Sequence, residues 1–113
     1  MEADCLDRDS IFKAVEGCKY VVHTASPFVM TQVEHEDVLV KPAVEGTQAA
    51  VEAAIQNKVK RIVITSSRAA VNIKSDKSQT KFSSADWSDL AACSAYAKSK
   101  TLAEMKAWEI QKG

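Results

Sequence analysis

The chain has 113 residues, enough for one domain at most. Hydrophobic residues make up 46% and charged residues 27%, which are ordinary values for a globular protein in water. The 15 basic and 15 acidic residues cancel, which argues against a nucleic-acid or membrane-surface partner. No apolar stretch approaches the ~20 residues that a membrane span needs.

The cysteines and histidines predict neither disulfides nor a metal site. The three cysteines are odd in number and lack the spacing of metal ligands, so we expect reduced thiols in a cytoplasmic protein. His23 and His35 stand too far apart to suggest a shared metal ion. The first four residues are polar and acidic, unlike a signal peptide.

The first predicted elements are short. Residues 1–5 are expected to be the end of a strand. Asp7 or Asp9 is expected to cap a helix that continues to about Glu16. The apolar, β-branched run at 20–25 predicts a buried strand.

A long helix is expected over 36–56, because apolar residues recur there every three or four positions. Gly46 inside it would let the helix approach a backbone or a ligand closely. The run at 61–65 predicts a second buried strand, and the long polar stretch at 68–92 predicts a functional or disordered connection. The last helix is expected over 95–111, with Ser94 as its cap.

This alternation of strands and helices predicts an α/β fold with a parallel sheet. Ligands bind such sheets beyond the carboxyl ends of the strands. The segments Thr24-Ala25-Ser26 and Thr65-Ser66-Ser67 both follow predicted strands, so their small polar side chains should face one crevice.

The run Tyr96-Ala97-Lys98-Ser99-Lys100 carries the clearest chemical signal. Residues four apart lie on one face of a helix, so Tyr96 and Lys100 should be neighbours. An ammonium beside a phenol favours the phenolate, and a nearby serine hydroxyl could hold a substrate oxygen. These groups can pass a proton to or from a carbonyl or alcohol oxygen. The structural alternative is a tyrosine packed under a lysine stem.

Five segments then match one family in its own order. The chain resembles the extended short-chain dehydrogenase/reductase family, in particular its dihydroflavonol-reductase-like branch. The matching segments are His23-Thr24-Ala25-Ser26-Pro27, Lys41-Pro42-Ala43-Val44-Glu45-Gly46-Thr47, Arg61-Ile62-Val63-Ile64-Thr65-Ser66-Ser67, Asp86-Trp87-Ser88-Asp89 and Tyr96-Ala97-Lys98-Ser99-Lys100-Thr101-Leu102-Ala103-Glu104.

The resemblance implies reduction of a ketone or aldehyde, a small-molecule carbonyl substrate, by NAD(P)H. Tyr96 would be the proton donor. Lys100 would bind the nicotinamide ribose and favour release of the Tyr96 proton. Ser67 would hydrogen-bond the substrate oxygen, with Ser66 as the second choice. Asn72 matches a position near the substrate.

The resemblance also implies cofactor contacts. The cofactor would be NADP, with NAD as the alternative. Thr24, Ala25 and Ser26 match the strand tip that lies along the cofactor. Asp4 and Cys5 match a pair whose aspartate contacts the adenine end.

Some features depart from the family pattern. Arg68 follows the catalytic serine, where this branch has a small residue, and would either alter the substrate pocket or face solvent. The Asn-Trp-Tyr-Cys-Tyr signature of cinnamoyl-CoA reductases is absent around Tyr96, whereas His-Thr-Ala-Ser-Pro-Phe is more similar to microbial and fungal reductases.

The family's glycine-rich turn, Gly-x-x-Gly-x-x-Gly, is also absent, since none of the three glycines forms it. We therefore expect residues 1–113 to be the central part of an NAD(P)-binding Rossmann domain, incomplete at both ends. The expected fold is a partial doubly wound parallel sheet, with strands near 20–25 and 61–65 and flanking helices. A bare strand edge would invite pairing with another chain, and the isolated chain should be inactive.

Two alternatives remain open. The same Ser, Tyr and Lys serve nucleotide-sugar epimerases or dehydratases and hydroxysteroid dehydrogenases of this family. The other alternative is that the chain is a non-catalytic interaction module, in which the Ser, Tyr and Lys residues are relics.

Overall fold

The computed structural model describes residues 1–29 and 33–113. Its elements confirm the predicted alternation of strands and helices. Their bounds, in chain order, are α1 (Arg8–Val15), β1 (Tyr20–His23), α2 (Asp37–Gln56), β2 (Arg61–Ile64), the short 3₁₀ helices η1 (Arg68–Ala70) and η2 (Leu90–Ala92), and α3 (Ala95–Lys112).

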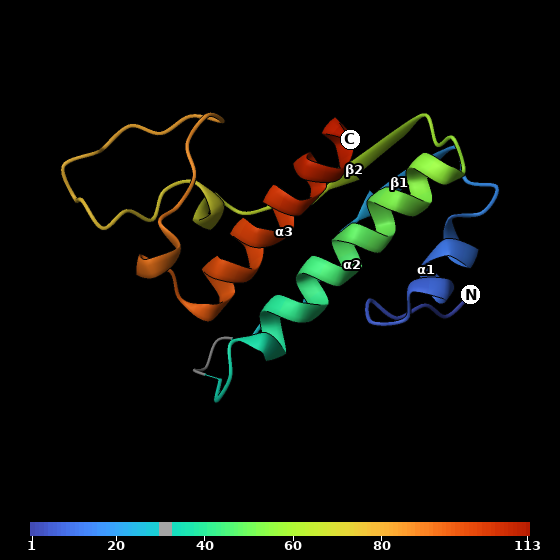
Figure 1. Ribbon diagram of the computed structural model, residues 1–113, viewed down its shortest axis with the longest axis horizontal. Helices are drawn as coiled ribbons and strands as arrows, with labels where there is room; N and C mark the ends of the chain where they lie inside the picture. The colour runs from blue at the N-terminus through green and yellow to red at the C-terminus, as the bar shows by residue number, and fades with distance from the viewer. Residues whose placement is uncertain (30–32) are drawn as a thin grey trace.

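The two strands form a parallel sheet, as predicted. Tyr20 lies opposite Arg61 at one end of the register, and His23 lies opposite Ile64 at the other. The chain passes between the strands through α2, which packs on both of them. Figure 1 shows the three α-helices side by side, with α2 between α1 and α3 and in front of the strands.

The strands bury one face and expose the other, because successive side chains of a strand point to opposite sides. His23 is buried on the side that faces α2. Tyr20, Val22 and Val63 on the opposite side are 60%, 68% and 51% exposed. Among the described residues, helices therefore cover only one face of this sheet.

The core lies where α2 meets the sheet and α3, and it is built mainly from small side chains. Ser99 and Thr101 are fully buried on α3, and their hydroxyls donate to the carbonyl oxygens of Tyr96 at 2.6 Å and Ala97 at 2.8 Å. Most buried hydroxyls in proteins have such a partner. The buried apolar residues of the two helices are Leu39, Ala43, Ala49, Ala50, Val51, Ala53, Ala54, Ala97 and Ala103.

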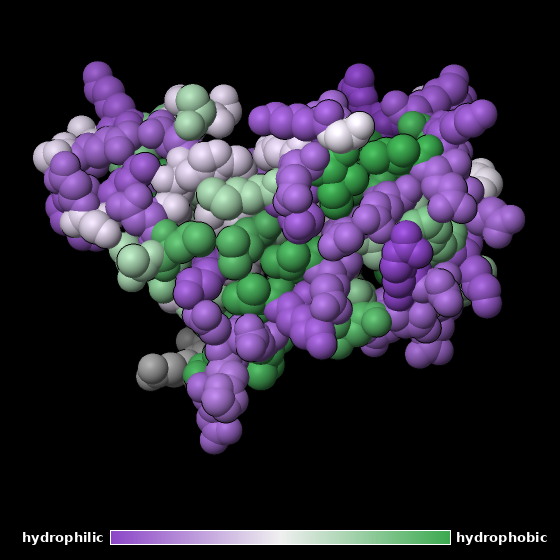
Figure 2. All heavy atoms as spheres, viewed as in Figure 1, coloured by the Kyte–Doolittle hydropathy of each residue, from purple (hydrophilic) through white to green (hydrophobic). Residues whose placement is uncertain are grey.

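The outer groove between α2 and α3 has apolar residues among charged ones. Its apolar lining is Val40 and Val44 from one helix and Leu102 and Met105 from the other, and its charged lining is Asp37, Lys41, Glu45, Lys106 and Glu109. Figure 2 shows hydrophobic residues along this groove, with hydrophilic residues on both sides of it. No helix in residues 1–29 or 33–113 is long and apolar enough to cross a membrane.

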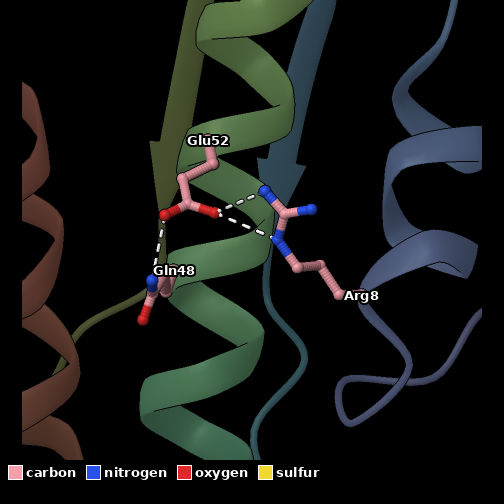
Figure 3. Close-up of polar contacts among 3 residues, drawn as sticks. All are labelled: Arg8, Gln48 and Glu52. Carbon is pink, nitrogen blue, oxygen red and sulfur yellow. Dashed lines mark hydrogen bonds and ion pairs between the residues drawn. The ribbon is translucent and has the colours of Figure 1, made fainter.

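Helix α1 has the predicted cap and is tied to α2 by charge. The Asp7 carboxylate accepts from Ser10 N at 3.2 Å, and Gly17 ends the segment with a φ of +76°, which favours glycine. Arg8 donates twice to Glu52 Oε2, at 3.2 and 3.0 Å, while Gln48 donates to Oε1 at 2.9 Å (Figure 3).

The strand expected at residues 1–5 is wrong. Asp4 instead begins a turn in which its side-chain Oδ1 accepts from Leu6 N at 2.7 Å. A strand needs a hydrogen-bonded neighbour, whereas this segment satisfies its backbone through local side chains. Cys5, the next residue, packs against Gly46 of α2. A Cβ added at Gly46 would lie 2.8 Å from the Cβ of Cys5. The close approach expected at Gly46 is therefore confirmed, with Cys5 as the neighbour.

Candidate functional site

A small cavity, of about 10 Å³, lies at the carboxyl ends of both strands, where the sequence predicts a crevice. Ala25 and Ser26 follow β1, and Thr65 and Ser66 follow β2. Lys100 reaches the same cavity from α3. The further lining residues are His23, Thr47, Ile64, Ala103 and Glu104.

Lys100 joins α3 to the tip of β2. Its Nζ donates to the carbonyl oxygen of Thr65 at 3.2 Å, and the residue is only 8% exposed. Burial lowers the pKa of Lys100 below its usual 10.5. An ammonium group carries three donors, so Lys100 can serve a further acceptor in the cavity.

Ser26 supplies a second polar group with capacity for a ligand. Its Oγ is buried and has no hydrogen-bond partner in the part of the chain that the structure describes. A buried hydroxyl without a partner costs free energy, so a polar ligand entering here would satisfy it.

His23 forms the floor of the cavity and is held by α2. Its Nε2 lies 3.3 Å from Thr47 Oγ1, and both residues are buried. Burial and, to a smaller extent, the positive charge of Lys100 lower the pKa of His23 below 6.5. The imidazole is therefore neutral at neutral pH and does not add a second cation beside Lys100.

Tyr96 lies at the start of α3, one turn before Lys100, as its spacing predicts. Its ring meets the edge of Phe28, with centroids 5.0 Å apart and planes at 80°. Since Phe28 follows β1 closely, this contact brings Tyr96 to the segment that leaves the first strand. Ser94 caps the helix by accepting from Ala97 N at 3.2 Å, as expected.

Ser67 stands at the junction of β2 and η1. It caps η1, and its Oγ accepts from Ala69 N at 3.2 Å. The 3₁₀ turn that follows packs against α3. The neighbouring Ser66 lines the cavity instead and donates to the Glu104 carboxylate.

Asp4 and Cys5, expected at the adenine end, and Thr24, expected along the cofactor, are not among the residues that line this cavity. Asp4 is exposed, with its carboxylate in the local turn, and Thr24 is exposed beyond β1. Cys5 lies near the β1 tip, with its Sγ 3.9 Å from the carbonyl oxygen of Ala25. Burial, helped by the charge of Asp4, raises the pKa of the Cys5 thiol above 9.0.

Asn72 and Arg68 bind one another. In the amide orientation that satisfies both ends, Asn72 donates to the Arg68 carbonyl oxygen at 2.9 Å and accepts from its guanidinium at 3.1 Å. Arg68 is exposed. The cation after Ser67 therefore lies at the surface at the start of the loop, and Asn72 is held there with it.

The long connection is anchored by the Asp86-Trp87-Ser88-Asp89 motif. Ser88 is 4% exposed; its Oγ donates to the Ala69 carbonyl oxygen at 2.7 Å and accepts from Ile73 N at 2.9 Å. The backbone of Ser88 also donates to the Ala70 carbonyl oxygen at 2.8 Å. This motif thus fixes the segment that follows Ser67.

Glu104 is a charged residue of the cavity lining that the sequence did not predict as a site residue. It stands four positions after Lys100, so Tyr96, Lys100 and Glu104 form one stripe of α3. Continuing the four-residue step from the Tyr-x-x-x-Lys pair would have found it. Within the described residues, no group of three or more metal-ligating side chains occurs.

The parallel strands joined through α2 define an α/β domain with a cavity at the carboxyl ends of its strands. The chain belongs to the 3-beta hydroxysteroid dehydrogenase/isomerase family, whose model matches residues 1–109.

Curated relatives and solved structures agree with that membership. Cinnamoyl-CoA reductase 2 of Arabidopsis thaliana is 37% identical over 97% of this chain and 33% of its own length. Dihydroflavonol 4-reductase of Gerbera hybrida is 33% identical over 99% of this chain and 32% of its own. The chain thus spans about a third of the length of the curated relatives it matches.

Among solved structures, the yeast methylglyoxal/isovaleraldehyde reductase Gre2 complexed with NADPH matches with a TM-score of 0.76 and 33% identity. The match covers 96% of this chain and 36% of the yeast chain. Gre2 of Candida albicans in complex with NADPH gives a TM-score of 0.81 at 28% identity, over 97% of this chain and 37% of that one. The partial Rossmann fold is therefore confirmed.

Proposed function

We propose that residues 1–113 form the central part of an NAD(P)-binding Rossmann domain in an NADPH-dependent reductase of ketones or aldehydes. The observation that carries this proposal is the meeting of Lys100 with the β2 tip, at 3.2 Å from the Thr65 carbonyl oxygen, in a cavity shared with Ser26. The NADPH complexes of the two similar reductases support NADPH over NADH. Reductases among the curated relatives support a small carbonyl substrate.

In this proposal, Lys100 and Ser26 hold hydroxyl groups of the cofactor, and Thr24 and Ala25 lie along it. Asp4 and Cys5 serve the adenine end. NADPH supplies the hydride when bound. The chain's own residues handle the carbonyl oxygen: Ser67 donates a hydrogen bond to it and Tyr96 gives it a proton. Asn72 lies near the substrate.

The three free thiols, Cys5, Cys18 and Cys93, support a reducing compartment, the cytoplasm.

The deciding experiment is the substitution Tyr96→Phe in the reductase that carries this segment. Removing the proton donor should lower turnover at least ~100-fold, with the Kd for NADPH changed less than about twofold. The control is Tyr20→Phe, the only other tyrosine of the chain, which is exposed on the uncovered sheet face. Equal turnover of the Tyr96→Phe and Tyr20→Phe variants would refute the assigned roles.

A second candidate is oxidation or reduction of a hydroxysteroid, which the description of the matching family favours. Turnover assays with simple ketones, hydroxysteroids and sugar nucleotides would separate these activities. Absence of turnover with all three, together with no NADPH binding, would favour a non-catalytic module.

A further inference from the structure

Glu104 is fixed at both oxygens of its carboxylate. Oε2 accepts a hydrogen bond from Ser66 Oγ, and Oε1 accepts from Trp108 Nε1 at 3.3 Å. Trp108 stands one turn further along α3 and is half exposed. The carboxylate is thus oriented by its own helix and presented to the strand tip.

Helix α3 consequently binds two consecutive residues at the end of β2. Lys100 donates a hydrogen bond to the carbonyl oxygen of Thr65, and Glu104 accepts one from the hydroxyl of Ser66. The next residue is Ser67. On its other side, Ser67 enters η1, which packs against the same helix. The backbone around Ser67 is therefore held from both sides by α3.

We propose that Glu104 is a positioning residue: by binding Ser66 it fixes the Ser67 hydroxyl relative to Tyr96 and Lys100 on the same helix. This inference rests on the proposed reductase function. Misplacing a reacting group by about 1 Å can cost ~100-fold in rate. Since Ser66 still has its neighbours in β2 and η1, we expect a loss of about 10-fold when the link is broken.

The test is a double-mutant cycle in the reductase that carries this segment. Glu104→Ala and Ser66→Ala should each lower kcat about 10-fold, with the KM for NADPH within about twofold. The double variant should be no slower than either single variant, because both remove the same hydrogen bond. Glu109→Ala is the matched control, an exposed carboxylate on the same helix.

A conservative variant separates the hydrogen bond from the charge. In Glu104→Gln, the amide keeps one acceptor for Trp108 and offers a donor to the Ser66 oxygen. We therefore expect Glu104→Gln to keep most of the wild-type kcat. If Glu104→Ala fails to fold, Ser66→Ala and Glu104→Gln still decide the question.

Two results would overturn the inference. One is a kcat of the double variant that is reduced by the product of the two single-variant factors. The other is an unchanged kcat in Ser66→Ala. Ser67→Ala and Tyr96→Phe in the same assay distinguish this from failure of the proposed function. If those two variants lose turnover while Ser66→Ala keeps it, the reductase assignment stands and only the positioning role falls. If they keep turnover, the reductase roles themselves are wrong.

Discussion

The buried ammonium of Lys100 donates to the backbone carbonyl oxygen of Thr65 at 3.2 Å. This bond joins the helix that carries Tyr96 to the strand tip that carries Ser67. Removing a charge from water costs free energy that one neutral acceptor only partly offsets. A lysine buried in this place therefore lowers the stability of the fold.

The first prediction concerns the stability of Lys100→Met. Because burial lowers the pKa of Lys100, the unfolded chain holds this proton to a higher pH than the folded chain does. The amine thus weakens the fold at neutral pH, and wild-type stability recovers as the pH rises through the interval between the lowered pKa and 10.5. Urea denaturation should show Lys100→Met equal to or above wild type at pH 7, with the difference falling by pH 10.

Lys98→Met is the control for this experiment. Lys98 lies on the same helix and forms an ion pair with Glu36 at 2.8 Å near the surface. Its loss should lower stability slightly, by ~0.2–1 kcal/mol, with no recovery of the kind described for Lys100. A Lys100→Met variant that is less stable by the same amount at both pH values would contradict the prediction.

The second prediction concerns Ser88→Ala in the long connection. Losing the hydroxyl leaves the Ile73 N–H and the Ala69 carbonyl oxygen without this partner. Each unsatisfied buried group costs ~1–3 kcal/mol, so the connection should open more often. Amide hydrogen exchange over 71–89 should accelerate about 10-fold or more, while the exposed Ser84→Ala leaves it unchanged. Equal exchange in both variants would contradict a clamp at Ser88.

The third prediction concerns acid sensitivity of the contact between α1 and α2. The hydrogen bond from Gln48 and, next, the guanidinium of Arg8 lower the pKa of Glu52 below 4.5 (Figure 3). The stabilisation is present above the unfolded pKa and disappears as the pH falls through the lowered one. Glu52→Gln should therefore cost about 0.2–1 kcal/mol at pH 7 and much less at pH 3.

Thermal unfolding of wild type, Glu52→Gln, Arg8→Met and the double variant measures this effect. The coupling between the two positions should shrink in 1 M salt, because the Arg8 side chain is 60% exposed and is screened. Coupling that persists at low pH would show that the pair is held by packing and not by charge.

Most elements follow from local patterns in the sequence. The β-branched runs predict β1 and β2, which end one or two residues earlier than expected, at His23 and Ile64. Ser94 and Asp7 predict the starts of α3 and α1, because a cap depends only on its own turn. These features need no knowledge of distant contacts.

What the sequence did not predict depends on pairs far apart in the chain. The bond between Ser66 and Glu104 joins residues 38 positions apart, and nothing in the sequence around either residue predicts the other as its partner. Ile55 fits the apolar spacing of α2, yet it is 57% exposed, because small residues such as Ala50 and Ala54 form the buried stripe. The segment 1–5 is placed where the end of a strand is expected, but strand pairing is set by neighbours, and none is present for it among the described residues.

The uncovered side of the sheet affects how the isolated chain behaves in the test tube. Tyr20, Val22 and Val63 place three large apolar side chains in contact with water on one flat surface. Exposed apolar surfaces of this kind promote self-association. The extent of self-association of the chain will therefore depend on protein concentration. Spectroscopic measurements should start from dilute protein or from a solubilising fusion.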